Sequence, residues 1–186
     1  MRDRVALITG GSRGIGAETA LALADHGYDI AFTYRNKEAR AREVIAAVTQ
    51  RGVRALALAC DMTHSSDLES LFQQLMHWTD HLDVLILNAS GGMERDLAAA
   101  DPQYPMRINR DAQLLFTRAA LPLLLDGSVI VFVTSHWAHL YGQIGQLPVY
   151  EPVAESKHAG EQAIRARHNE FAARGYPTRR GHRRPR

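Results

Sequence analysis

The stretch TGGSRGIG, residues 9–16, decides how this sequence folds. It joins a short apolar run at residues 4–9 to a helical pattern at residues 14–26, in which apolar side chains recur every three or four positions. Glycines at such a junction let the chain turn tightly and bring its backbone close to a ligand. The free N–H groups at the start of the helix suit a pyrophosphate. In this strand–turn–helix context, the glycine pattern predicts a dinucleotide-binding loop.

The same alternation of strand and helix continues along the chain. Further strands are expected at residues 28–34, 53–59, 82–88 and 128–135, and further helices at residues 37–50, 103–125 and 152–174. Another helix is expected from a cap at Ser65 or Ser66 to about Trp78. Strands that are apolar on both faces and alternate with helices predict a parallel sheet covered on both sides. We therefore expect a three-layer, doubly wound, Rossmann-like α/β fold with strand order 3-2-1-4-5.

Length and composition limit the class of protein. The 186 residues suffice for one domain with a real core, and 46% hydrophobic with 23% charged residues is typical of a globular, soluble chain. No apolar run approaches the length that crosses a bilayer. The single Cys60 allows no intrachain disulfide, which favours a cytoplasmic location, and nothing resembles a metal site.

Charge divides the chain unevenly. The last 13 residues, Arg174–Arg186, hold six Arg and no acid, so the net charge of +2 becomes −4 for residues 1–173. We expect one domain over residues 1–174 and a basic, disordered tail over residues 175–186, because the tail has no apolar periodicity. Nucleic-acid binding by this tail is a third-ranked alternative.

The glycine loop resembles the TGxxxGIG element of the short-chain dehydrogenase/reductase family, and the resemblance continues in order from residue 4 to about residue 174. The further matches are Asp61 in ACDM, the NASGG run at residues 88–92, Asn109 in RINRD, Ser135 at the end of the fifth strand in VTSH, and Lys157 in SKHAGE. Six ordered matches are far more specific than any one of them.

The resemblance implies hydride transfer between a nicotinamide cofactor and a carbonyl or alcohol, with proton transfer through Tyr, Lys, Ser and Asn. A Tyr phenol has a reference pKa of about 10, which a nearby Lys⁺ lowers. The catalytic residues so implied are Asn109, Ser135, Tyr150 and Lys157. The cofactor-binding residues so implied are Gly10, Ser12, Arg13, Gly14, Ile15, Gly16, Arg35, Asp61, Met62, Asn88, Ala89 and, again, Lys157.

The Tyr is the one catalytic residue out of place. The family keeps it four residues before the Lys, where this sequence has Val153. Tyr150 stands seven residues before Lys157, about 10 Å along a straight helix, but fifteen after Ser135, close to the family's usual gap. We take Tyr150 as a displaced catalytic acid. An ordinary packing role for Tyr150 stays open, as does replacement by Tyr141, His136 or His139.

Two arginines bear on the choice of cofactor. Arg13 in the glycine loop and Arg35 after the second strand could both meet a 2′-phosphate, and the stretch TYRNK has no acid before Glu38. Relatives that prefer NAD usually carry an acid there. The sequence therefore predicts NADP(H) rather than NAD(H).

The family usually continues after the last helix with a sixth and a seventh strand, but no β-branched strand pattern follows Phe171. We expect a C-terminally shortened member whose fifth strand is a sheet edge. The family also assembles through its long helix and its final helix, which implies a homodimer or homotetramer here. The alternative to an oxidoreductase is a cofactor-binding protein with little or no catalysis, a truncated remnant or a regulator.

Overall fold

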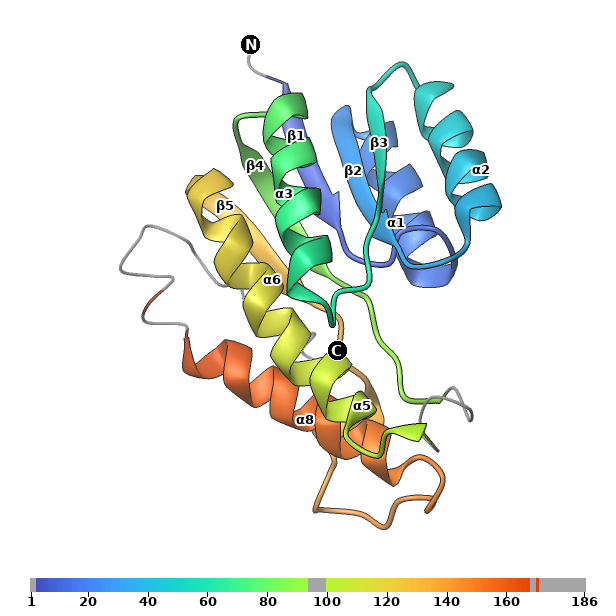
Figure 1. Cartoon of the computed structure of the whole chain (residues 1–186), viewed down its shortest axis with the longest axis vertical. Coiled ribbons are helices and arrows are strands. Elements are labelled where there is room, and N and C mark those ends of the chain that lie inside the picture. Colours follow the sequence, from blue (N-terminus) through green and yellow to red (C-terminus); the bar gives the residue numbers. More distant parts are fainter. Residues whose placement is uncertain (1–2, 94–99, 168–169, 171–186) are drawn as a thin grey trace, which may run out of the picture.

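Five parallel strands form one sheet in the computed structural model, which describes residues 3–93, 100–167 and 170 (Figure 1). The strand order is β3-β2-β1-β4-β5, so the predicted fold class and order are confirmed. The strands are β1 (Arg4–Ile8), β2 (Tyr28–Tyr34), β3 (Ala55–Ala59), β4 (Leu82–Leu87) and β5 (Leu124–Phe132).

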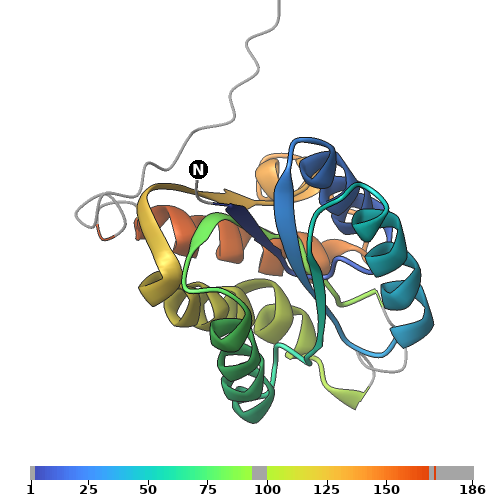
Figure 2. The ribbon, with the colours of Figure 1, turned by 90° about the horizontal axis from the view of Figure 1, so that it is seen from above.

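Helices cover both faces of the sheet (Figure 2). On one face lie α1 (Gly14–Asp25) and α2 (Glu38–Thr49), and on the other lie α3 (Ser65–Trp78), α6 (Ala112–Ala120) and α8 (Glu151–Ala166). Two apolar layers result, because successive strand residues point to opposite faces. Ile8 and Phe32 belong to the first layer, and Leu7 and Leu85 belong to the second.

The long connection from β4 to β5 is helical and contains an irregular turn. It runs through α5 (Tyr104–Met106), the π-turn η1 (Arg107–Asp111), α6 and the 3₁₀ turn η2 (Leu121–Leu123). The helix predicted at residues 103–125 is therefore one helical run, widened by a π-turn that contains Asn109. Single π-turns inside helices often mark functional sites.

The fifth strand and the last helix have boundaries that differ from the prediction. The fifth strand starts earlier than residue 128, since Ser128 Oγ donates to Leu82 O and accepts from Leu125 N and so extends the pairing with β4. It also ends at Phe132, so Ser135 does not end the strand but precedes the short helix α7 (His136–His139). The last helix begins at Glu151, and its predicted end at residue 174 lies outside the described residues.

Within the described part of the chain, β5 is an edge strand, as predicted, and pairs with β4 alone. Its side chains alternate, with Ile130 buried and Val131 40% exposed. The helices α1 and α2 pack on β1, β2 and β3, the three strands that β4 separates from β5. The apolar side chain of Val131 thus remains open to solvent on that face.

The approach of α8 to the π-turn depends on Gly160. An ideal Cβ on Gly160 would lie 2.1 Å from the backbone oxygen of Asn109. Gly160→Ala should gain about 1 kcal/mol of helix propensity, but the clash forces two backbones apart at a cost of about 2–3 kcal/mol. We expect a net loss of about 1–2 kcal/mol in the free energy of unfolding, measured by urea denaturation.

Gly145→Ala is the matched control, because no atom lies within 4 Å of its added Cβ and its φ is not in the left-handed region. It should change the free energy of unfolding by less than about 0.5 kcal/mol. Equal stability of Gly160→Ala and the wild type would contradict the close approach of α8 to the π-turn.

Candidate functional site

The glycine loop is held between two strands at the carboxyl edge of the sheet. Gly10 N donates to Thr33 Oγ1 at 3.0 Å, and Gly11 N donates to Thr33 O at 2.9 Å. On the other side, the buried hydroxyl of Thr9 accepts from Asn88 N and Ala89 N, both at 2.9 Å. The loop is therefore tied to the end of β2 and to the end of β4.

The start of α1 sits directly on this loop. An ideal Cβ on Gly16 would lie 2.3 Å from Gly10 O and 2.6 Å from Asn88 Nδ2, so only glycine fits. Gly14, with φ +53°, has no atom within 4 Å of its ideal Cβ, which leaves space beside the first turn of α1. A helix start with open glycine backbone beside it fits a pyrophosphate. The residues present therefore suit the dinucleotide that the resemblance implies.

The other loop residues lie at different depths. Ser12 is buried, Arg13 is exposed and immediately precedes α1, and Ile15 is 65% exposed. Ser12 therefore belongs to the loop's packed side, whereas the Arg13 and Ile15 side chains can reach a ligand at the start of α1.

Asn88 and Ala89 support the loop from behind. Asn88 Nδ2 donates to Thr9 O at 3.0 Å and to Gly10 O at 3.2 Å, so its amide holds the loop's backbone. Ala89 O accepts from Gln113 Nε2 at 2.9 Å, and Gln113 is buried. Gln113 was not predicted as a site residue. Nothing in the sequence separates it from other polar residues of the long helix.

The predicted adenosine end contains Arg35, Asp61 and Met62. Arg35 Nη1 donates to the Tyr104 hydroxyl at 2.5 Å. Burial raises the pKa of Asp61, but hydrogen bonds from Thr63 and the charges of His64 and Arg35 outweigh it and hold that pKa below its usual value. The Met62 side chain is 4% exposed and lies in the core, so its backbone alone could meet a cofactor.

Asn109 connects three segments of the site. Its Nδ2 donates to Gly91 O at 2.9 Å and to Ser156 Oγ at 3.0 Å, and its Oδ1 accepts from Gly91 N at 3.2 Å. Ser156 is fully buried and donates to Val153 O. The structure thus joins the NASGG segment, the π-turn and α8 through one buried amide. Ser156, which immediately precedes Lys157, is a second site residue that the sequence did not predict.

Lys157 is half-buried on α8, and the described residues offer its ammonium group no hydrogen-bond or ion-pair partner. Burial lowers the pKa of Lys157 below its ordinary value of 10.5. A desolvated cation without a carboxylate beside it is costly to the fold, which marks Lys157 as a functional candidate.

Ser135 and Tyr150 flank the segment between β5 and α8. The Ser135 side chain accepts from Ala138 N at 3.2 Å and so caps α7. Tyr150 immediately precedes α8 without a side-chain capping bond, and its ring centroid lies 6.3 Å from that of Trp137. No hydrogen bond joins Tyr150 to Lys157 in the described part of the chain.

The structure also places Val153 and two of the alternative acids, Tyr141 and His136. Val153 is 3% exposed, and its Cγ2 would lie 3.1 Å from an ideal Cβ on Gly92, so it fills space beside the NASGG segment. Burial, followed by the charges of Glu155 and Glu151, raises the pKa of Tyr141, which disfavours its phenolate. The His136 ring packs against Trp137 with centroids 5.0 Å apart.

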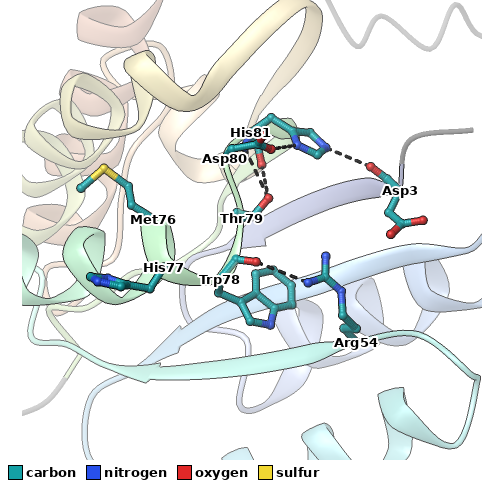
Figure 3. Close-up of a pocket in the computed structure, with 8 residues that line it drawn as sticks. All are labelled: Asp3, Arg54, Met76, His77, Trp78, Thr79, Asp80 and His81. Atoms are coloured by element: carbon teal, nitrogen blue, oxygen red, sulfur yellow. Dashed lines mark hydrogen bonds and ion pairs between the residues drawn. The ribbon is translucent and has the colours of Figure 1, made fainter.

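A hollow of about 410 Å³ lies away from this site (Figure 3). Asp3, Arg54 and His81, which line it, each immediately precede a strand, so the hollow lies at the amino edge of the sheet. Arg54 pairs with Asp29, and the two His81 nitrogens bond to Asp80 and to Asp3 O. Arg54 and His81 thus already have hydrogen-bond partners.

The described residues contain no group of three or more His, Cys, Asp or Glu placed to hold a metal ion. No helix in the described ranges is both long and apolar enough to cross a membrane.

Lys157 should limit stability. The folded pKa of Lys157 is lowered, so in the window between it and 10.5 the unfolded chain binds more protons, and stability rises with pH there. Below that window the full cost of the buried charge is present. Lys157→Met should therefore raise Tm at pH 7 by about 2–4 °C, the shift that about 1 kcal/mol gives, measured by calorimetry. Lys37→Met, at an exposed lysine, is the control and should not move Tm. A lower Tm for Lys157→Met would contradict the unpaired state.

Known proteins are similar to this chain in sequence and in fold. The chain matches the family model described as short chain dehydrogenase over residues 4–176. It is 32% identical over 169 residues to hydroxynaphthalene reductase-like protein Arp2 of Metarhizium brunneum, covering 89% of this chain and 62% of that protein. It is 32% identical over 180 residues to hydroxynaphthalene reductase arp2 of Aspergillus fumigatus, covering 94% of this chain and 63% of that one.

A solved structure agrees. A short chain dehydrogenase from Burkholderia cenocepacia, in complex with NADP, superposes with a TM-score of 0.81 at 31% identity, covering 93% of this chain and 70% of that one. The chain thus spans less than two thirds of the length of the two reductases that it matches. With the family model covering nearly all of it, the chain belongs to the short-chain dehydrogenase/reductase family.

Proposed function

We propose that this chain is an NADP(H)-dependent oxidoreductase that interconverts a carbonyl and an alcohol. The observation that carries the proposal is the glycine loop, where Gly16 packs on Gly10 O and Gly14 leaves the first turn of α1 open. This arrangement supports dinucleotide binding with the pyrophosphate at the start of α1. The reductases that the chain resembles support the reaction class.

The cofactor, when bound, supplies or accepts the hydride. Ser135 Oγ already accepts from Ala138 N, so its own proton is free to be donated to a substrate carbonyl oxygen. Tyr150, at the start of α8, is our proposed proton donor. Lys157 brings a positive charge to the site, and Asn109 holds the backbone of Gly91 and of α8 through Ser156.

The alternative function also has an observation in its favour. Buried Val153 fills the position four before Lys157, and no hydrogen bond joins Tyr150 to Lys157 in the described residues. A protein of this kind would bind the dinucleotide without efficient turnover. The basic tail, and with it nucleic-acid binding as a third reading, lies outside the described residues.

Turnover tests the proposal against this alternative. Purified protein should oxidise NADPH, followed at 340 nm, with some member of a panel of ketones and quinones that includes hydroxylated naphthalenones. Tyr150→Phe should lower kcat about 10²- to 10⁴-fold and leave the Kd for NADPH within about twofold, because the phenol acts on substrate. Tyr141→Phe is the matched control.

Three outcomes are informative. Wild-type rates in Tyr150→Phe, with loss in Tyr141→Phe, would move the acid to Tyr141. Wild-type rates in both variants would place the acid elsewhere. Saturable NADPH binding with no turnover on the panel would favour the non-catalytic alternative.

Cofactor preference rests on Arg13 and Arg35. A charge-assisted hydrogen bond to a 2′-phosphate contributes about 1.5–3 kcal/mol, so NADPH should bind about 10- to 100-fold more tightly than NADH, measured by energy transfer from tryptophan. Arg35→Ala should remove most of this preference. Arg42→Ala, which breaks only the exposed pair with Glu38, is the control. Equal affinity of the wild type for the two cofactors would reject the preference.

Assembly and location are also proposals. The long helical run before β5 and the final helix α8 are both present, which supports a homodimer or homotetramer. Sedimentation velocity that finds monomers alone at about 50 μM would contradict it. The cytoplasmic location rests on the single Cys60 of the sequence. Burial, followed by the charges of Asp67 and Asp61, raises the pKa of the Cys60 thiol to about 12, which makes this thiol unreactive.

A further inference from the structure

Ser135 lies in a short segment of the connection between β5 and α8. The segment comprises Thr134, Ser135 and the helix α7. Inside it, Ala138 N donates to Ser135 Oγ at 3.2 Å, and His139 N donates to Ser135 O at 3.0 Å. These bonds fix Ser135 relative to α7, but they do not fix α7 relative to the rest of the site.

The first tether from α8 to this segment is His158. Its Nδ1 lies 2.9 Å from Ala138 O. A carbonyl oxygen can only accept, so Nδ1 carries the proton. Ala138 thus donates its N–H to Ser135 and accepts at its carbonyl from His158. The His158 ring also packs on Tyr141, with centroids 5.7 Å apart.

The second tether is Glu161, a carboxylate whose side chain is 9% exposed. Its Oε2 accepts from the Thr134 hydroxyl at 2.9 Å, and its Oε1 accepts from Arg165 at 2.9 and 2.7 Å. Burial raises the pKa of Glu161, but the hydrogen bonds from Arg165 and Thr134 outweigh it, so the group is ionised at neutral pH. His139 Nδ1 lies 4.0 Å from Oε1 and adds attraction when protonated.

The two tethers bond to residues on either side of Ser135 in the sequence. Thr134 precedes it, and Ala138 lies three residues after it. Both tethers start on α8, where His158 immediately follows Lys157 and Glu161 lies about one turn further. A backbone hydrogen bond from Val133 N to Leu87 O at 3.0 Å holds the start of the segment to β4, and these two side chains hold it to the helix that carries Lys157.

We propose that His158 and Glu161 are positioning residues that hold Ser135 at a fixed place relative to Lys157. The inference deepens the proposed function and rests on it, because Ser135 is the group that would contact the substrate. Neither side chain touches the glycine loop in the described structure, so cofactor binding should not depend on them.

Conservative pairs of variants test the tethers in the intact chain. Thr134→Val removes the hydroxyl that Glu161 accepts, and His158→Ala removes the donor to Ala138 O. Each should lower kcat about three- to tenfold, the effect of one net hydrogen bond, with KM and the Kd for NADPH unchanged. Thr134→Ser and His158→Asn keep a donor in place and should restore most of the rate.

A double-mutant cycle separates positioning from general stability. In the Ser135→Ala background, His158→Ala and Thr134→Val should have almost no further effect on kcat, because the group that they position is gone. Their effects on Tm should still add to that of Ser135→Ala. Full, additive losses of kcat in the Ser135→Ala background would overturn the proposal.

Hydrogen exchange gives a readout that needs no turnover. In His158→Ala, the amides of Ala138 and His139 should exchange about tenfold faster than in the wild type, whereas amides of β4 and β1 should keep their rates. Unchanged exchange at both positions would overturn the proposal.

The same experiments distinguish the two proposals. A wild-type chain without turnover, or a Ser135→Ala variant with full turnover, contradicts the proposed function, and exchange at Ala138 then decides the tethers alone. Loss of rate in Ser135→Ala, with no effect of His158→Ala or Thr134→Val, contradicts only the tethers.

Discussion

The close packing of α1 on the glycine loop is the constraint on which the rest of the site depends. Gly16 has no room for a Cβ beside Gly10 O and the Asn88 amide, and Asn88 in turn bonds to Thr9 O and Gly10 O. This contact brings β1, β4 and the start of α1 to one point at the carboxyl edge of the sheet. A side chain at residue 16 would displace all three at once, because closely packed interiors transmit strain.

A second close contact organises the other half of the site around α8. Gly160 lets this helix touch the π-turn at Asn109, whose amide holds Gly91 and Ser156. The helix then supplies Lys157 and the two side chains that bond to the Ser135 segment. This lysine is half-buried, and burial lowers its pKa, as expected of a desolvated charge.

The local signals predicted the elements well and their ends less well. Tyr28–Tyr34 has the predicted bounds, and α3 ends at Trp78 as predicted. Its start differs, because His64 rather than Ser65 or Ser66 occupies the N-cap position. The fifth strand starts earlier than its apolar run, since Ser128 bonds to Leu82 O, a contact 46 residues away in the chain. The position of Ser135 beyond the strand follows from where the pairing with β4 stops.

The sequence by itself determined the fold and the dinucleotide loop, because glycine spacing and two-sided apolar strands are local properties of the chain. The tertiary structure alone decided the hydrogen-bond partners of Ser156, Gln113, His158 and Glu161, since each partner comes from a distant segment. It also decided that Val153 is buried and that Tyr150 stands immediately before the first residue of α8. Such contacts depend on how α8 packs against the π-turn, which no short stretch of sequence encodes.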